Sequence, residues 1–400
     1  MAERHHVALD SWRGIAAVMV ALLHFNATTP AHQTALVANA WLFVDFFFVL
    51  SGFVIAANYA ERLGQGFGPG RFLILRLGRL YPLHFVILAA FVASEAVLAV
   101  AGHHLGGSGR STFTGQTDPW AILTNLFLVH GVGFHEGLTW NGVAWSISTE
   151  MFAYIVFAAL AVACPRRLPW AMLGLIAVSL PFVLPEAFRP AGTRRFVELA
   201  RCFYGFGVGV MLRMAFAWLA GRGAEARLSV TGFSALELVS AGLAIAFVSA
   251  ASALPVHVLA PLAFAPAVLV FAFDRGWISR ILHHRWFVLL GTLSYSIYMI
   301  HPFVQSRILL PLTLAAQKAM GLSLVTLDRA STPAIFLWGE TALLGTLLTL
   351  AMLAVLLAAS LATYRWIEAP GRAATRRFSL GTERTATIVQ PPAGPHPLMR

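Results

Sequence analysis

The sequence contains few charged residues. Asp, Glu, Lys and Arg make up 11% of its 400 residues, whereas they form about a quarter of an ordinary soluble domain. Hydrophobic residues make up 58%, and the mean hydropathy is +0.74. A soluble protein cannot bury that much apolar surface. Composition therefore excludes a soluble enzyme or binding module and predicts a polytopic membrane protein.

Cysteine is also scarce. The two cysteines, Cys164 and Cys202, fall on opposite sides of the membrane in the topology given below, so we expect neither a disulfide nor a metal site. The sequence has no Walker A loop, no G-x-G-x-x-G fingerprint and no convincing internal repeat. Its formal net charge is +11. In a membrane protein that surplus bears on orientation rather than on nucleic-acid binding, and we expect no nucleic-acid partner.

Apolar runs of spanning length predict the fold. These runs cover residues 12–29, 40–58, 81–101, 142–163, 168–185, 196–215, 232–252, 255–273, 286–308 and 334–361. The first has no obvious cleavage site, so we expect it to be a retained span. The shorter run 120–132 suits an interfacial or re-entrant helix. We predict an all-α bundle of about ten transmembrane helices.

Arginines predict the orientation of this bundle. If the N-terminus lies in the cytoplasm, the cytoplasmic loops contain most of the basic residues, and the outer loops contain only Arg110, Arg189, Arg194, Arg195, Lys318 and Arg329. Both termini are therefore predicted to be cytoplasmic, in the inner (plasma) membrane of a bacterium. Residues 1–372 form the predicted membrane domain. Residues 373–400 are polar, basic and then proline-rich, and we expect a disordered cytoplasmic tail.

The first span contains two ionisable residues, Arg13 and His24. Eleven steps of about 100° bring both side chains to one helix face, about 16 Å apart along the axis. One interpretation is that Arg13 reaches the cytoplasmic interface and His24 is a packing residue. The other is functional, because ionisable side chains within spans are costly and mark functional paths. A neutral imidazole can act as a general base on a hydroxyl.

Three further segments contain candidate residues in the first half of the chain. Asp45 lies near the outer end of the second span and is expected either to cap it or to accept a hydrogen bond from His24 or another cation. Ser51-Gly52 favours close helix approach. Arg76 and Arg79 share a helix face, where paired guanidinium groups suit phosphate; lipid head-group contact is the alternative.

Two later spans contain polar residues at helical spacing. Ser146 and Glu150 are i, i+4 neighbours, and Glu150 lies in the outer half of its span, where an unpaired carboxylate is expensive. Ser294, Tyr298 and His301 form one stripe, which predicts either a wall that recognises hydroxyl groups or interhelical hydrogen bonds.

Depth separates these residues into a cytoplasmic set of arginines and an outer set of proton-handling groups. A phosphate-bearing donor inside and a hydroxyl acceptor outside suit that arrangement. A proton-coupled secondary transporter or flippase is the alternative, although such proteins usually show internal repeats and paired broken helices.

These motifs together resemble the membrane-bound acyltransferase family 3. The resemblance rests on Arg13-x10-His24, Asp45-Phe-Phe-Phe-Val-Leu-Ser-Gly-Phe, Arg76-Leu-Gly-Arg79, Trp145-Ser-Ile-Ser-Thr-Glu150, Ser294-Tyr-Ser-Ile-Tyr298-Met-Ile-His301-Pro and Tyr364-Arg-Trp-Ile-Glu368-Ala-Pro, in order over nearly the whole chain. It implies transfer of an acyl group, commonly acetyl from acetyl-CoA, to a hydroxyl of a surface carbohydrate, a membrane-associated acceptor or a small molecule. It also implies that Arg13 and His24 are the essential pair and that Arg76, Arg79 and Glu150 are functional.

A mechanism follows as a hypothesis. The phosphates of CoA bind Arg76 and Arg79, Arg13 orients the donor, and His24 acts as general base, with its imidazole oriented by Glu150 or Asp45. Ser146, Tyr298 and His301 are expected to contact the acceptor. Direct transfer and an acyl-enzyme both remain open. No metal is expected, membrane lipids surround the protein, and the sequence gives no oligomeric state.

Overall fold

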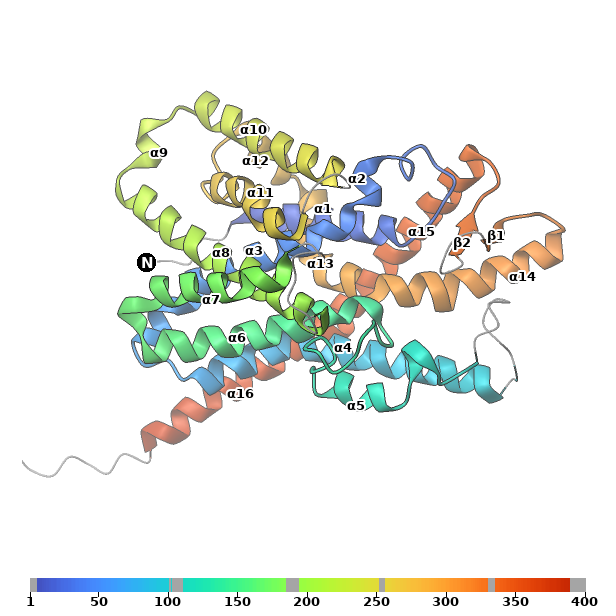
Figure 1. The fold of residues 1–400 in the computed structure, drawn as a ribbon, viewed down its shortest axis with the longest axis horizontal. Coiled ribbons are helices and arrows are strands. Elements are labelled where there is room, and N and C mark those ends of the chain that lie inside the picture. The colour runs from blue at the N-terminus through green and yellow to red at the C-terminus, as the bar shows by residue number, and fades with distance from the viewer. Residues whose placement is uncertain are drawn as a thin grey trace, which may run out of the picture.

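A computed structural model describes residues 6–100, 102, 111–184, 194–251, 256–329 and 335–388. Helices dominate these residues (Figure 1). The longer helices are α1 (Val7–Leu23), α3 (Phe43–Gly64), α4 (Pro69–Val100), α6 (Trp145–Ala163), α7 (Leu168–Val183), α8 (Val197–Gly221), α10 (Val230–Ser249), α11 (Val256–Phe271), α13 (Arg285–Phe303), α14 (Leu310–Met320), α15 (Ala342–Thr363) and α16 (Ala369–Ile388). Shorter elements are α2 (Ala35–Ala38), α5 (Trp120–Leu126), α9 (Ala224–Arg227), α12 (Trp277–Leu282), the strands β1 (Val325–Asp328) and β2 (Ile335–Trp338), and the π-helical turns Val304–Leu309 and Tyr364–Glu368.

Each of the ten predicted runs corresponds to a helix. Within the described residues, eight helical segments are long and apolar enough to cross a bilayer. The other two, α1 and α11, are shorter, with 17 and 16 residues. The predicted all-α, polytopic membrane fold is confirmed.

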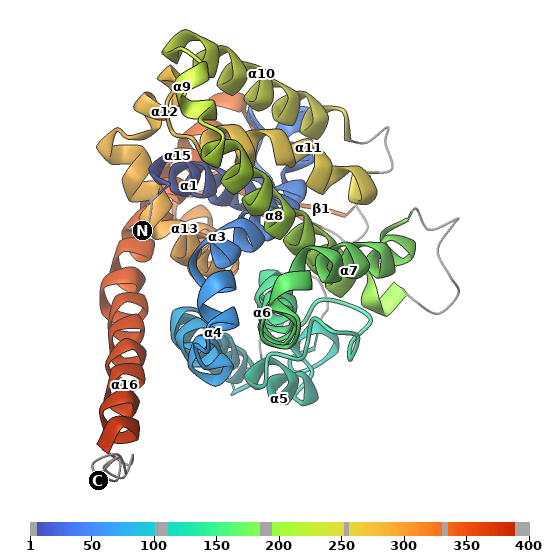
Figure 2. The same ribbon diagram turned by 90° about the vertical axis from the view of Figure 1, so that its left-hand side faces the viewer.

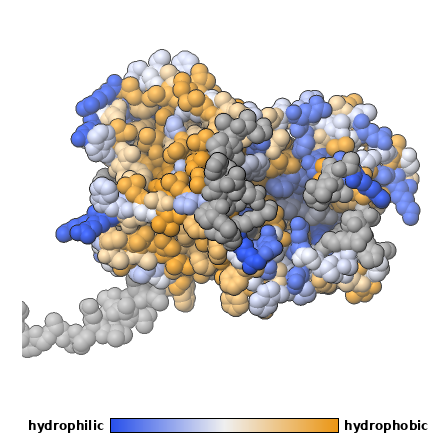
Figure 3. Space-filling view, viewed as in Figure 1, coloured by the Kyte–Doolittle hydropathy of each residue, from blue (hydrophilic) through white to orange (hydrophobic). Residues whose placement is uncertain are grey.

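Apolar side chains cover only part of the molecular surface. Figure 3 shows it over the region where α7, α10 and α11 run, and more hydrophilic side chains at the end that contains α14 and the β1–β2 hairpin. Leucines and valines of α10 are exposed there, because lipid rather than protein covers them: Leu238 is 67% and Val239 58% exposed. The 32 residues of α4 span about 48 Å, more than the hydrocarbon core of about 30 Å. The molecule therefore projects beyond the hydrocarbon core.

Glycines bring the central helices into backbone contact. A Cβ added at Gly52 of α3 would lie 2.0 Å from the Phe206 carbonyl oxygen of α8, and one at Gly209 of α8 would lie 2.0 Å from the Val49 carbonyl oxygen. No larger residue fits at either position. The close helix approach predicted at Ser51-Gly52 is confirmed, with α8 as the partner.

Two segments differ from the prediction. The run 334–361 does not begin as a helix, because Ile335–Trp338 forms strand β2, which pairs antiparallel with β1 and places Val325 opposite Trp338. The tail predicted from residue 373 begins inside α16, which packs against α4, and a Cβ at Gly78 would lie 2.0 Å from the Thr375 hydroxyl oxygen. Figure 2 shows α16 extending away from the bundle. Residues 389–400 of the predicted tail lie outside the described residues.

Candidate active site

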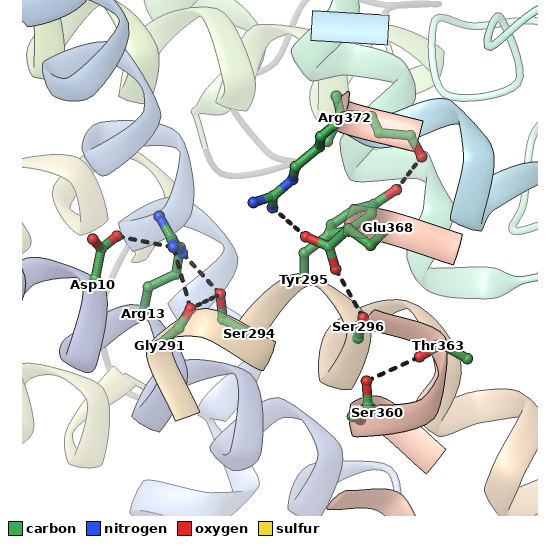
Figure 4. A network of polar contacts seen from close by, with 11 residues as sticks. Asp10, Arg13, Gly291, Ser294, Tyr295, Ser296, Ser360, Thr363, Glu368 and Arg372 are labelled. Atoms are coloured by element: carbon green, nitrogen blue, oxygen red, sulfur yellow. Dashed lines mark hydrogen bonds and ion pairs between the residues drawn. The ribbon is translucent and has the colours of Figure 1, made fainter. Parts of the chain in front are cut away.

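Arg13 is held at the contact between α1 and α13. Its Nε donates to the Ser294 hydroxyl at 2.8 Å and its Nη2 to the Gly291 carbonyl at 3.2 Å, and it pairs with Asp10 at 2.9 Å (Figure 4). The two helices approach this closely because both carry glycine: a Cβ at Gly14 would lie 2.4 Å from the backbone of α13. The guanidinium is therefore fixed by three groups rather than free to reach the interface.

His24 contacts the same helix. Its Nδ1 lies 2.8 Å from the Val20 carbonyl and 3.3 Å from His301 Nε2, while His301 Nδ1 lies 3.3 Å from the Ile297 carbonyl. Since a carbonyl only accepts, each Nδ1 carries the proton. His24 Nδ1–H then donates to Val20 and to the lone pair of His301 Nε2. His24 Nε2 is left unprotonated, and it has no hydrogen bond within the described part of the chain.

Both predicted side chains thus point to α13, as the helical spacing indicated. The position of His24 differs from the prediction, because the predicted span continues to residue 29, whereas α1 ends at Leu23 and His24 is its exposed C-terminal cap. The chain leaves the helix there because the next residues pair with the hairpin: Thr28 N donates to the Trp338 carbonyl at 2.9 Å, and Phe25 packs on the Trp338 ring at 4.6 Å.

A cavity of about 100 Å³ lies next to Arg13. It is lined by apolar residues of α3 and by polar residues from five helices. The polar residues are Arg13, Ser51, Arg79, Ser146, Glu150, Tyr154, Ser294, Tyr295 and Tyr298. Arg79 makes no hydrogen bond or ion pair with the described residues, so its guanidinium is available to an anionic group in the cavity. The prediction that Ser146 and Glu150 share one face is confirmed, since both line this cavity.

Glu150 forms the centre of a hydrogen-bonded group in the cavity wall. Its Oε1 accepts from the Ser51 hydroxyl and from the Tyr154 hydroxyl, each at 2.5 Å, and the two hydroxyl oxygens lie 3.1 Å apart. Two short charge-assisted hydrogen bonds keep the carboxylate in place. His24 is not among the described hydrogen-bond partners of Glu150, and its Nδ1 contacts Val20 and His301 instead, so the prediction that Glu150 orients the imidazole is wrong.

Tyr298 joins the cavity to the histidine pair. Its hydroxyl lies 2.9 Å from the Ser146 hydroxyl and donates to the Val143 carbonyl at 3.1 Å. Its ring lies 6.1 Å from the ring of His301, which lies 5.0 Å from that of His24. Neither histidine lines the cavity itself. The stripe predicted on α13 is therefore an interhelical contact surface that extends from Arg13 to His24.

Asp45 forms an ion pair with an arginine and does not contact His24. Arg201 of α8 binds it in a bidentate manner, with Nε 3.2 Å from Oδ1 and Nη2 2.7 Å from Oδ2. The Arg201 guanidinium also lies 5.4 Å and 5.5 Å from the ring centroids of Trp41 and Trp145. The Asp45 side chain is 0% exposed. Asp45 contacts a cation, as one of the predicted alternatives had it, but that cation is Arg201, so its predicted role at His24 is wrong.

Arg76 and Arg79 also have different surroundings. Arg76 Nη2 donates to the Tyr59 hydroxyl at 2.9 Å, and its guanidinium lies 4.9 Å from the Tyr59 ring and 5.9 Å from the Phe72 ring. Arg76 does not line the cavity. The two arginines are three residues apart on α4 and therefore share a helix face only approximately. Of the two, only Arg79 lines the cavity, because Arg76 packs against Tyr59 and Phe72.

Sequence comparison agrees with the motif pattern. The acyltransferase domain family matches residues 6–365. The chain belongs to acyltransferase family 3. This acyltransferase is also 34% identical to "Protein 2 in picA locus" from Rhizobium radiobacter over an alignment of 170 residues that covers 38% of the chain and 80% of that protein. No solved structure matches it. Family membership makes it a membrane-bound acyltransferase and decides against the transporter alternative.

Three residues of this acyltransferase site were missed by sequence reasoning. Ser51 was interpreted only as a small residue for helix packing, and Arg201 was not among the candidate residues. Tyr154 stands four residues after Glu150, and that i, i+4 spacing was a local signal for their hydrogen bond. Arg201 had no local signal.

Proposed function

We propose that this acyltransferase transfers an acyl group, acetyl in the simplest case, from cytoplasmic acyl-CoA to a hydroxyl of a carbohydrate or other membrane-associated acceptor. The observation that carries the proposal is the series of contacts along α13, from Arg13 at Ser294, through Tyr298, to His301 and His24. These contacts support a reaction path that follows α13 from Arg13, near one end of α1, to His24 at the other end.

The donor binds on the arginine side of this path. CoA carries several phosphate negative charges, and Arg79 is a guanidinium that lines the cavity without an ion-pair partner in the described residues. Arg13 is fixed at the same cavity by Ser294 and Gly291. In this proposal Arg79 binds the anionic part of the donor, Arg13 orients the arm that carries the thioester, and Glu150 keeps the Ser51 and Tyr154 hydroxyls in the wall beside it.

The acceptor is activated at His24. Its unprotonated Nε2 takes the proton of the acceptor hydroxyl while that oxygen attacks the thioester carbonyl, and the C–S bond then breaks. The CoA thiolate leaves and recovers the proton from the imidazolium, so that the products are an ester and CoA thiol. His301 accepts the hydrogen bond from His24 Nδ1–H and stabilises the imidazolium, as the third member of a catalytic triad does.

The His24→Ala protein tests this proposal. With equal amounts inserted in the membrane, the rate of acceptor acylation should fall about 10²- to 10⁴-fold, the contribution of a general base. Binding of acetyl-CoA should persist in His24→Ala and weaken in Arg79→Ala. The matched control is His32→Ala, an outer-loop histidine that contacts Asn26 and should leave the rate unchanged. Near-normal turnover by His24→Ala would reject the assignment.

A further inference from the structure

The first turn of α16 contains a cation that the reaction proposed above does not use. This residue is Arg372, whose Nη2 donates to the Glu368 carboxylate. The other oxygen of Glu368 accepts from the Ser296 hydroxyl of α13 at 2.8 Å. Among the described residues, Glu368 is the only hydrogen-bond or ion-pair partner of Arg372, and the buried Nε has none. The guanidinium group therefore has N–H groups left for a ligand.

Close packing holds this turn of α16 against α4, at the level of Arg79. A Cβ added at Gly371 would lie 2.6 Å from the side chain of Pro82, and one added at Gly78 would meet the Thr375 side chain. Gly78 and Pro82 stand on either side of Arg79 in the sequence of α4. The start of α16 therefore lies beside the arginine that lines the donor cavity, although the two helices are far apart in the sequence.

Three guanidinium groups meet at this place. Arg372 lies within electrostatic range of both Arg79 and Arg13, and its side chain extends toward that of Arg13 (Figure 4). Like charges this close repel one another. Arg13 and Arg372 each pair with a carboxylate, whereas Arg79 forms no ion pair within the described part of the chain. A phosphate group bound by Arg79 and Arg372 would offset the repulsion, and guanidinium groups match the geometry of its oxygens.

The position of each arginine relative to the cavity distinguishes their ligands. Arg79 lines the cavity, whereas Arg372 lies outside it with 37% of its side chain exposed. CoA has a diphosphate joined directly to the pantetheine arm and a third phosphate on the ribose, farther from the thioester. We propose that Arg372 binds this ribose 3′-phosphate while Arg79 binds the diphosphate, so that Arg372 makes the enzyme selective for CoA over thioesters without that phosphate. This proposal rests on the proposed acyl transfer.

Equilibrium binding to the full-length protein in phosphatidylcholine nanodiscs tests this proposal, with CoA and 3′-dephospho-CoA as the two ligands. These nanodiscs contain no anionic lipid whose head group could replace the nucleotide at Arg372. Because Arg372→Gln leaves the buried Glu368 without its cation, the double variant Arg372→Gln/Glu368→Gln is measured beside it. The matched control is Arg377→Gln, an exposed arginine of the same helix that lies about 140° further around the helix axis.

We expect the wild type to bind CoA about tenfold or more tightly than 3′-dephospho-CoA, as hydrogen bonds between charged groups predict. The single and double variants at Arg372 should bind both ligands with equal affinity, and Arg377→Gln should keep the wild-type ratio.

The assignment would be overturned by any of three results. These are a wild-type ratio in both Arg372 variants, an equal loss in Arg377→Gln, and equal binding of the two ligands by the wild type. The last result would leave the proposed acyl transfer intact, because CoA still binds. Binding of neither ligand by the wild type would contradict the donor of the proposed acyl transfer as well.

Discussion

At the scale of single residues, the ion pair between Asp45 and Arg201 has the clearest energetic consequence. Its side chains are 0% and 8% exposed, so removal of one charge leaves the other buried and unpaired. Asp45→Asn should lower the free energy of unfolding by about 3–5 kcal/mol, and Asp45→Asn with Arg201→Gln by less than the sum of the single changes. A double-mutant cycle from denaturant unfolding in detergent micelles measures this. Additive single effects would show that the pair contributes no coupling.

His301 has a different kind of effect, since it acts through His24. His301→Phe removes one of the two acceptors for His24 Nδ1–H and leaves the Val20 carbonyl as the other, whereas His301→Gln keeps an acceptor oxygen on a side chain of similar length. We expect kcat to fall about 10- to 100-fold in His301→Phe, as for other groups that orient a functional histidine, with partial recovery in His301→Gln. The KM for acetyl-CoA should not change in either variant. A KM effect without a kcat effect would instead assign His301 to donor binding.

The residue positions that sequence predicted correctly depend on local geometry. Arg13 and His24 face one helix because 11 residues come close to three full turns, and Ser146 and Glu150 share a cavity for a similar reason. The role of Asp45 depended on a partner 156 residues away, for which the sequence carries no local signal. The charge of Asp45 alone does not show whether its partner is His24 or Arg201.

At the scale of elements, the contact between α1 and α13 depends on glycine. An added methyl at Gly14 would lie 2.4 Å from the backbone of Leu290, and backbone cannot move aside as a side chain can. Gly14→Ala should therefore destabilise the protein by about 1–3 kcal/mol or more and reduce activity by displacing Arg13. Thermal unfolding in micelles, together with the acylation rate, measures both effects.

The matched control for this change is Gly242→Ala. Gly242 lies within α10 and has no atom within 4 Å of an added Cβ, so alanine should be neutral or stabilising by about 0.5–1 kcal/mol. If Gly14→Ala were as stable as Gly242→Ala, the close approach of α1 and α13 would be contradicted.

Element boundaries were the part of the fold least accessible from sequence. Hydropathy predicted a run to residue 29, but α1 ends at Leu23 because residues 26–28 form backbone hydrogen bonds with Trp338, more than 300 positions later. The same pairing explains why the run that begins at 334 starts as a strand. Non-local strand pairing leaves no periodic signature in two such short segments.

At the scale of the whole molecule, the spans and their composition were predictable, and the projection beyond the bilayer was not. Figure 1 shows the start of α1 and the end of α16 toward the end of the molecule that carries α9, opposite α14 and the hairpin. An even number of spans requires this arrangement of the termini. The projection arises because α4 and the segment Arg285–Met320 are 32 and 36 residues long, and hydropathy windows do not reveal how far a helix continues beyond the membrane.

The proposed reaction includes the claim that donor and acceptor reach the enzyme from opposite sides of the bilayer. Proteoliposomes of known orientation test it most directly, with labelled acetyl-CoA added only to the side that contains α9 and the acceptor enclosed on the side of the hairpin. We predict labelled acceptor in wild-type vesicles and at least about a hundredfold less with His24→Ala. Transfer only when donor and acceptor share one compartment would contradict the claim.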